Sequence, residues 1–479
     1  MMRMGNHRSR PAVRGVAAAV AFIGLLACGG GGGGGGDGGG SESQAPTDSS
    51  RCPADALEAA TAPVPVTVWH GMTAANGETL SALTDEYNAS QRKVKVQLVF
   101  QGNYDETSDK YLTALRGGEL PGIVQLEETR LQLMIDSGSV VPAQTCVDAA
   151  GYDLSDHLAQ VVAQATVDGV LWPMPFNVST PVLFYNRKAF EAAGLDPDAP
   201  PATFDELRAA AQKVVDSRVA EYGFAIGLAP DFIEQWFAKA NVAFTDHDNG
   251  RTGRATHVAY DAPIALQIYT FLAGLVQDGL AVNTGRQAAG PNHLLSVGSG
   301  QSAMTIASSA VLGSVFDILG QGQFPAVGVE GAAVAPMPGP TGGGVLPGGG
   351  SLYLVGKDKS PEEVAAAFDY ARFLNEPETQ ARWHAGTGYL PIRTSALDLP
   401  EVATLWAARP AYRVAYDQLL ASAATLGGPV IGAYGQVRDI ELASLERVLL
   451  EGQDPAAAVA AAQRDADAAI AAYNDSVGG

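Results

Sequence analysis

Short apolar runs alternate with stretches whose apolar residues recur at helical spacing. Residues 66–69 form such a run and predict a strand, and residues 80–87 carry the helical spacing that follows it. Apolar side chains stand at nearly every second position of residues 94–100, which predicts a second strand. A helix over 105–116 and a buried strand over 123–126 continue the series. Strands and helices that alternate with short connections form βαβ units, so this block predicts a parallel sheet.

A second block of the same kind begins after about Asn177. Residues 182–185 predict another buried strand. Thr203 and Ser360 each stand three residues before a Glu, which is the spacing of a capping box at a helix start. The Gly- and Pro-rich stretch 336–350 interrupts regular structure and is a candidate crossover between the blocks.

The Ala-rich tail, residues 455–473, is predicted as a helix that docks on the body, and it shows no repeat or heptad pattern. The chain has 479 residues, which is long enough for two domains. Two α/β blocks joined by several connections predict two lobes with a cleft between them.

The first 27 residues have the pattern of a signal peptide. Four arginines precede the apolar run 16–27, which is too short to cross a bilayer and suits the core of a signal peptide. The run ends in Leu25-Leu26-Ala27-Cys28, which resembles the bacterial lipobox and implies cleavage before Cys28 and diacylation of its sulfur. The alternative is a secreted protein in which Cys28 is incidental.

Residues 28–60 follow as a predicted tether. Eight consecutive glycines, 29–36, open this stretch, and polar residues continue it. Because it offers little apolar surface to bury, we expect a flexible chain that holds the body near the membrane.

The charge balance excludes two classes of partner. The chain has 30 Lys and Arg against 51 Asp and Glu, a net charge of −21, and the signal peptide removes four of the cations. Nucleic acid requires a basic face, and so does peripheral attachment to anionic lipid. We therefore expect a small-molecule ligand, no nucleic acid, and membrane contact through the lipid anchor only.

No catalytic motif stands out. The sequence lacks the His-Glu-x-x-His, Gly-x-Ser-x-Gly and P-loop patterns, and its seven His are scattered. Residues 320–325 begin like a dinucleotide fingerprint but lack its third glycine and place a proline where a helix should start. We expect a protein that is not an enzyme and has no cofactor and no metal site.

Besides Cys28, the chain has two cysteines, Cys52 and Cys146. An exported protein meets an oxidising environment, which favours a disulfide between them. Two buried thiols are the alternative. Neither cysteine has His or Cys at zinc-ligand spacing.

Several stretches resemble the extracellular solute-binding proteins of ABC importers, and in particular the group that binds sn-glycerol-3-phosphate and glycerophosphodiesters. Their order matches over nearly the whole mature body. The motifs Pro-Phe-Asn-x-Ser-Thr-Pro and Thr-Gly-Tyr-Leu-Pro are specific to that group. The matching stretches are residues 68–72, 101–106, 123–128, 175–186, 303–309, 348–352 and 386–391.

The resemblance implies a periplasmic-binding-protein-like α/β fold, with two lobes, crossover hinge strands and a ligand in the cleft. Residues 175–185 look like the first crossover. We expect lobe 1 to comprise residues 61–179 and 338–390, and lobe 2 to comprise 180–337 and 391–479. We also expect a monomer that works with the membrane subunits of an importer.

The resemblance also implies a ligand shell. Carried over position by position, it consists of Tyr104, Glu128, Ser179, Ser308, Gly349, Tyr389 and Arg438. A guanidinium such as that of Arg438 can hold two phosphate oxygens, and the serines, Tyr389 and the Gly349 N–H would be neutral donors. The lack of a side chain at Gly349 would let the ligand approach. Glu128 would accept hydrogen bonds from glycerol hydroxyls or face a cation.

Each of these residues also has a simpler interpretation. Arg438 could pair with Asp439 on a helix surface, the serines could be turn residues, and the tyrosines could belong to the core. Glu127 stands beside Glu128, where the group usually has a Tyr, and one of the two carboxylates could be merely solvated.

A further departure concerns ligand choice. Leu228 stands where glycerol-3-phosphate binders have a Trp, so the pocket should be larger. Asp231, Phe232 and Trp236 follow, and carboxylates with aromatic faces favour a quaternary ammonium. We therefore expect glycerophosphocholine, or another glycerophosphodiester, to bind better than glycerol-3-phosphate.

Three other functions are weaker alternatives. An oligosaccharide ligand would call for several aromatic platforms, but only five Trp occur and most lie in predicted structural segments. An exported glycerophosphodiester hydrolase would need a metal cluster or a His pair. An adhesin or scaffold would be expected to show repeats.

Overall fold

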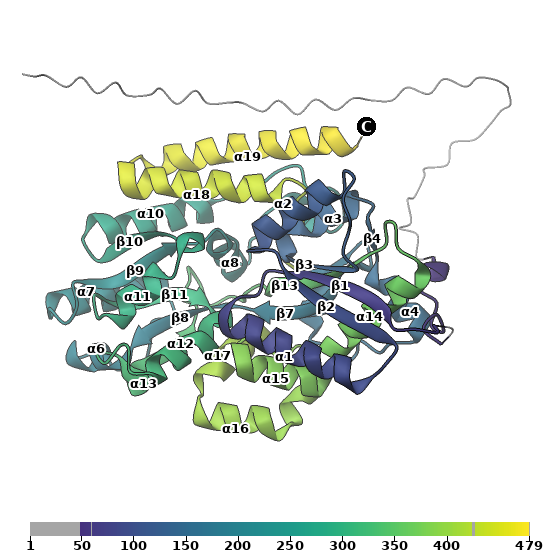
Figure 1. The fold of residues 1–479 in the computed structure, drawn as a ribbon. Helices are drawn as coiled ribbons and strands as arrows, with labels where there is room; N and C mark the ends of the chain where they lie inside the picture. The colour runs from purple at the N-terminus through teal and green to yellow at the C-terminus, as the bar shows by residue number, and fades with distance from the viewer. Residues whose placement is uncertain (1–47, 59, 424–426, 479) are drawn as a thin grey trace, which may run out of the picture. The chain divides into compact units, whose positions relative to one another are not determined.

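The computed structural model describes residues 48–58, 60–423 and 427–478. The predicted signal peptide, the lipidated Cys28 and most of the predicted tether lie outside these residues. The described chain forms two β-sheets with helices on their faces (Figure 1).

The first sheet has the strand order β2-β1-β3-β13-β4, and β7 also pairs with β13. Strand β1 is parallel to β2 and β3, whereas β13 is antiparallel to β3, β4 and β7. The strands are β1 (Val64–His70), β2 (Val94–Phe100), β3 (Ile123–Glu127), β4 (Val140–Val141), β7 (Met174–Ser179) and β13 (Gly348–Val355). The parallel core is the βαβ unit that the periodicity predicts.

The second sheet has the order β10-β9-β11-β8-β12. Strand β9 is parallel to its neighbours, and β8 is antiparallel to β11 and β12. The strands are β8 (Pro181–Asn186), β9 (Tyr222–Leu228), β10 (Ala281–Arg286), β11 (Ser302–Ser308) and β12 (Ala332–Pro336). A separate hairpin pairs β5 (Thr166–Val167) with β6 (Val170–Leu171).

Helices cover both sheets. We call the first sheet and its helices lobe 1. These helices are α1 (Ala74–Ser90), α2 (Tyr104–Ala114), α3 (Leu131–Asp136), α4 (Ala143–Ala150), α5 (Ala159–Ala165), α14 (Pro361–Leu374) and α15 (Pro377–Thr387). Lobe 2 is the second sheet with these helices: α6 (Arg187–Ala192), α7 (Phe204–Asp216), α8 (Asp231–Lys239), α9 (Asp246–Gly250), α10 (Pro263–Gln277), α11 (Asn292–Gly298), α12 (Leu312–Gly320), α13 (Gly328–Gly331), α17 (Ala411–Leu420), α18 (Tyr434–Glu451) and α19 (Pro455–Val477). Helix α16 (Pro400–Ala408) packs mainly against α15 of lobe 1. Figure 1 shows α18 and α19 side by side.

The chain crosses between the sheets where the sequence places crossovers. Strand β7 ends at Ser179 in the first sheet and β8 begins at Pro181 in the second, so Thr180 alone separates them. The Gly- and Pro-rich segment 337–347 makes the return crossing from β12 to β13. The prediction of an irregular stretch up to residue 350 was wrong at the C-terminal end, because Gly348–Gly350 are already part of β13.

Local signals account for the helix starts. Thr203 and Ser360 form the predicted capping boxes of α7 and α14, and Asn103 forms another with Glu106 at the start of α2. Helix α2 runs from Tyr104 to Ala114, so its predicted end at residue 116 is two residues too late.

Each lobe has its own apolar core. Strands β7 and β8 are buried at every position, as expected for strands covered on both faces. In the structure Cys52 and Cys146 form a disulfide, which ties the start of the body to α4. Among the described residues, no helix combines the length and the apolar character that crossing a membrane requires.

Candidate functional site

A cleft of about 930 Å³ lies between the lobes. Strand ends and the turns that follow them supply part of its lining, and helix α18 supplies another part, which includes Arg438. All ten residues that the sequence assigns to a ligand line this one cleft: Tyr104, Glu127, Glu128, Ser179, Leu228, Asp231, Ser308, Gly349, Tyr389 and Arg438.

Two tyrosines in the floor of the cleft are fixed by one amide. Asn177 on β7 is fully buried, and with its oxygen turned toward them it accepts from Tyr104 Oη at 2.7 Å and Tyr389 Oη at 3.2 Å. The ring of Tyr389 stacks on Trp383 at a centroid distance of 5.4 Å. Since both hydroxyl protons point to Asn177, the phenol oxygens offer lone pairs to the cleft. In this arrangement they suit hydroxyl donors of a ligand better than phosphate oxygens, so Tyr389, expected as a donor, would act as an acceptor.

The two serines meet at the crossover. Ser308, at the end of β11, donates to Ser179 Oγ at 2.9 Å and accepts from the Ala310 N–H at 3.2 Å. The Ser179 hydroxyl keeps its own proton for a ligand. Both residues therefore join the lobes and line the cleft at the same time.

Gly349 is required by the backbone more than by a ligand. Its φ is +112°, and a Cβ there would lie 2.2 Å from the carbonyl oxygen of Asn177. Its N–H donates to Glu128 Oε2 at 2.9 Å, so this donor is already used. The expected direct approach of a ligand to Gly349 is therefore not the reason that glycine stands here.

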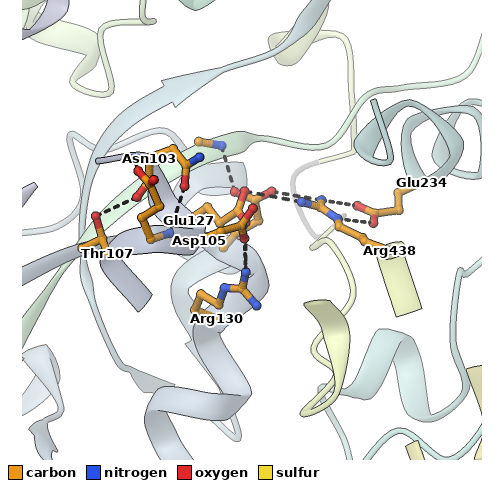
Figure 2. Close-up of polar contacts among 10 residues, drawn as sticks. Asn103, Asp105, Thr107, Glu127, Arg130, Glu234 and Arg438 are labelled. Atoms are coloured by element: carbon orange, nitrogen blue, oxygen red, sulfur yellow. Dashed lines mark hydrogen bonds and ion pairs between the residues drawn. The ribbon is translucent and has the colours of Figure 1, made fainter. Parts of the chain in front are cut away.

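Arg438 is surrounded by carboxylates (Figure 2). Its Nε and Nη2 donate to the two oxygens of Glu234 at 2.9 and 2.8 Å, a bidentate pair. Across the cleft, Glu127 lies 3.4 Å from Nη1 and Glu128 lies 3.5 Å from Nη2. The alternative pairing with Asp439 is wrong, because Asp439 instead lies near Arg286.

Glu127 and Glu128 are both partly buried, with side chains 21% and 16% exposed, so neither is merely solvated. Burial raises the pKa of Glu128 to about 8, an effect that Arg438 opposes and Glu127 reinforces. Burial likewise raises the pKa of Asp231 to about 6. Burial alone would lower the pKa of Arg438, but Glu234 outweighs it and keeps that pKa well above its ordinary value.

The other two arginines that line the cleft are also paired. Arg130 bonds Asp105 and lies 3.9 Å from Glu127. Arg286 holds Glu446 through Nε and Nη2 at 2.8 and 2.7 Å. The lining contains six carboxylates against these three guanidinium groups: Asp105, Asp109, Glu127, Glu128, Asp231 and Asp439. The cleft is therefore acidic, and it favours a ligand that carries a positive group.

The wall at Leu228 is built differently from the expectation. Leu228 lines the cleft with Asp231. Phe232 and Trp236 point into the core of lobe 2, where Trp236 Nε1 donates to the Pro338 carbonyl at 3.0 Å. Aromatic contact with a quaternary ammonium would have to come from the cleft tyrosines instead, and Asp231 is the charged group at this wall.

Sequence reasoning missed Asn177 and Glu234 as site residues. Asn177 lies within the matched Pro-Phe-Asn motif, and that position could have identified it as a site residue. The sequence signal for Glu234 was weaker: it lies three residues after Asp231, so the two side chains share a face of α8. Among the described residues, no group of three or more His, Cys, Asp or Glu side chains is arranged to hold a metal ion.

Comparison with known proteins agrees with this architecture. Residues 82–411 match the family model described as bacterial extracellular solute-binding protein. The sn-glycerol-3-phosphate-binding periplasmic protein UgpB of Rhizobium meliloti is 32% identical, over 84% of this chain and 93% of that protein. UgpB of Yersinia pestis is 30% identical, over 82% and 89%.

Solved structures show the same fold. The GacH receptor of Streptomyces glaucescens, studied with acarbose, superimposes with a TM-score of 0.71 at 21% identity, covering 86% of this chain and 99% of that one. UgpB of Mycobacterium tuberculosis in complex with glycerophosphocholine gives 0.68 at 23% identity, with 85% and 98% covered. Two α/β lobes, the cleft between them and these matches lead to one conclusion: the chain belongs to the bacterial extracellular solute-binding proteins.

Proposed function

We propose that this protein captures a glycerophosphodiester, preferably glycerophosphocholine, in the interlobe cleft and delivers it to an ABC importer. Its closure on the ligand would be a hinge motion of the two lobes. The observation that carries the ligand choice is the charge of the cleft, where six carboxylates face three arginines that are each already paired.

Charge distinguishes the two main candidates. A phosphate monoester carries close to two negative charges at neutral pH, whereas glycerophosphocholine carries one negative and one positive charge. Asp231 and Glu127 would attract the quaternary ammonium and repel the dianion. Glu128, whose pKa is raised to about 8, would add to this attraction only when a bound cation favours its ionised form. The tyrosine oxygens fixed by Asn177 would accept from the glycerol hydroxyls, and the Ser179 hydroxyl would donate to the phosphate.

The second candidate is sn-glycerol-3-phosphate. It is favoured by the names of the UgpB relatives at 30–32% identity. Leu228 and the paired state of Arg438 argue against it in this chain.

Calorimetric titration of the purified protein with both compounds tests the proposal. We expect glycerophosphocholine to bind more tightly than glycerol-3-phosphate at neutral pH. Tighter binding of glycerol-3-phosphate, or binding of neither compound, would contradict the ligand assignment.

We also propose that the exported protein is held at the membrane by lipid on Cys28. The lipobox-like motif Leu25–Cys28 and the glycine-rich segment after it support attachment to the membrane. Fractionation of cells that express Cys28→Ser should find the protein released from the membrane fraction, and continued membrane retention would refute the anchor.

A further inference from the structure

A second cavity, of about 230 Å³, lies in lobe 2 between α11 and α12 and above strands β8 and β12. Its walls are side chains that carry hydrocarbon: Leu294 and Val297 from α11, and Val315 and Leu319 from α12. Phe184 of β8 lies at its floor. Such a surface gains free energy when apolar groups replace water on it.

The cavity is a groove that runs along α12, and its inner end adjoins the ligand cleft at one shared residue, Val311. Val315 and Leu319 lie four residues apart on one face of α12, and Val311, the residue just before the helix, extends the same stripe. A rise of 1.5 Å per residue makes this stripe about 12 Å long. Val311, at its inner end, lines both the groove and the cleft.

The outer end of the groove is open and apolar. Leu295 and Ile318 line it there and are 43% and 38% exposed. The hydroxyl of Tyr185 is turned away from the groove, since it donates to the Pro197 carbonyl at 2.7 Å. Ser314 is a small residue midway along the stripe, and a larger side chain there would block the groove.

We propose that this groove binds the acyl chain of a monoacyl glycerophosphodiester, a lysophospholipid, whose head group occupies the cleft. The inference rests on the proposed function and widens its ligand class from the deacylated diester to the singly acylated one. An acidic, polar cleft joined through Val311 to one apolar groove matches a molecule with one polar head and one chain.

A chain-length series tests the groove. The purified full chain is titrated by calorimetry with glycerophosphocholine and with its 1-acyl derivatives from acetyl to octanoyl, each below its critical micelle concentration and without detergent. Burial of one methylene corresponds to roughly a fourfold gain in affinity. We expect affinity to rise by up to about that factor per methylene and to level off once the groove is full.

Two variants locate the chain. Ser314→Phe fills the groove from α12, and Ala332→Leu fills it from β12, where Ala332 packs in the same cluster as Phe184 and Val315. Each should abolish the gain from the acyl chain and leave the affinity for glycerophosphocholine unchanged. Asp317→Phe is the matched control, because it places the same aromatic ring on the exposed side of α12. The control variant should keep the gain in affinity that the acyl chain provides.

The outcomes separate the two proposals. If glycerophosphocholine binds but the acyl derivatives bind no more tightly, the groove is not a lipid site and the proposed function stands. The same conclusion follows if both groove-filling variants keep the full gain, because the chain then lies elsewhere, and the groove would instead be available to an importer subunit. If glycerophosphocholine fails to bind, the proposed function itself is contradicted.

Discussion

The side chain of Arg438 lines the cleft, and its nearest charged partner is Glu234, a residue that the sequence analysis did not name. The family resemblance, carried over position by position, assigned Arg438 to the ligand shell, and it does line the cleft. Its guanidinium, however, is held by Glu234, which comes from a helix 200 residues away in sequence. A buried charge requires a partner, and breaking such a pair costs about 3–5 kcal/mol. The pair therefore leaves little of Arg438 for a phosphate.

At the residue scale, the charge of Asp231 should control affinity. Its pKa is raised to about 6, and Arg438, Glu234 and Glu127 are the charged groups that act on it. A quaternary ammonium favours the ionised form, so affinity for glycerophosphocholine should rise from pH 5 to pH 7. Below pH 6 the loss should approach about tenfold per pH unit.

Asp231→Asn should bind more weakly than the wild type at pH 7 and should lose the pH dependence in this window. Calorimetry at pH 5, 6 and 7 measures both effects. Folding stability moves the other way: a raised pKa in the folded state means that the unfolded chain loses its proton first, so this group's contribution falls as pH rises from about 4 to 6. Identical pH profiles for both proteins would show that Asp231 does not face the cation.

At the scale of elements, the start of α2 positions a cleft residue. Asn103 caps the helix by accepting from the Glu106 N–H at 2.9 Å, and Glu106 bonds the Asn103 N–H in return (Figure 2). Tyr104 is the next residue and the first of the helix. The cap thus fixes the backbone that carries a cleft phenol.

Asn103→Ala should lower stability by about 1 kcal/mol and also weaken ligand binding. Ser360→Ala is the matched control, because it removes the capping box of α14, whose helix carries no residue of the cleft lining. Ser360→Ala should lower the stability of the protein by a similar amount and leave its affinity for the ligand unchanged. Chemical denaturation and calorimetry give the two readouts; equal effects of both variants on affinity would rule out a specific role for the α2 cap.

At the scale of the whole molecule, a cluster of polar contacts joins the two lobes. Asp136 on α3 of lobe 1 bonds Arg254 of lobe 2 and accepts from Tyr473 Oη of α19 at 2.9 Å. The Asp136 side chain is only 7% exposed, whereas that of Arg254 is 38% exposed. The pair is therefore partly screened, and we expect about 1 kcal/mol from it.

Asp136→Asn should shift the ligand-free protein toward the open state and weaken ligand binding roughly fivefold. Small-angle scattering of the free protein should show a larger radius of gyration. Glu86→Gln is the control, since Glu86 pairs with Arg382 inside lobe 1. An unchanged scattering profile and affinity in Asp136→Asn would show that this contact does not hold the lobes.

The sequence by itself predicted most of the elements, the two-lobe α/β fold and ten of the residues that line the cleft. Periodicity, capping pairs and matched words are local, and local preferences decide strands, helix starts and crossovers such as Ser179 to Pro181. Only the tertiary structure decided how those side chains share their protons and charges. Asn177 takes the protons of two tyrosines and Glu234 takes Arg438, because partners far apart in sequence meet only after folding, where burial makes each unpaired polar group costly.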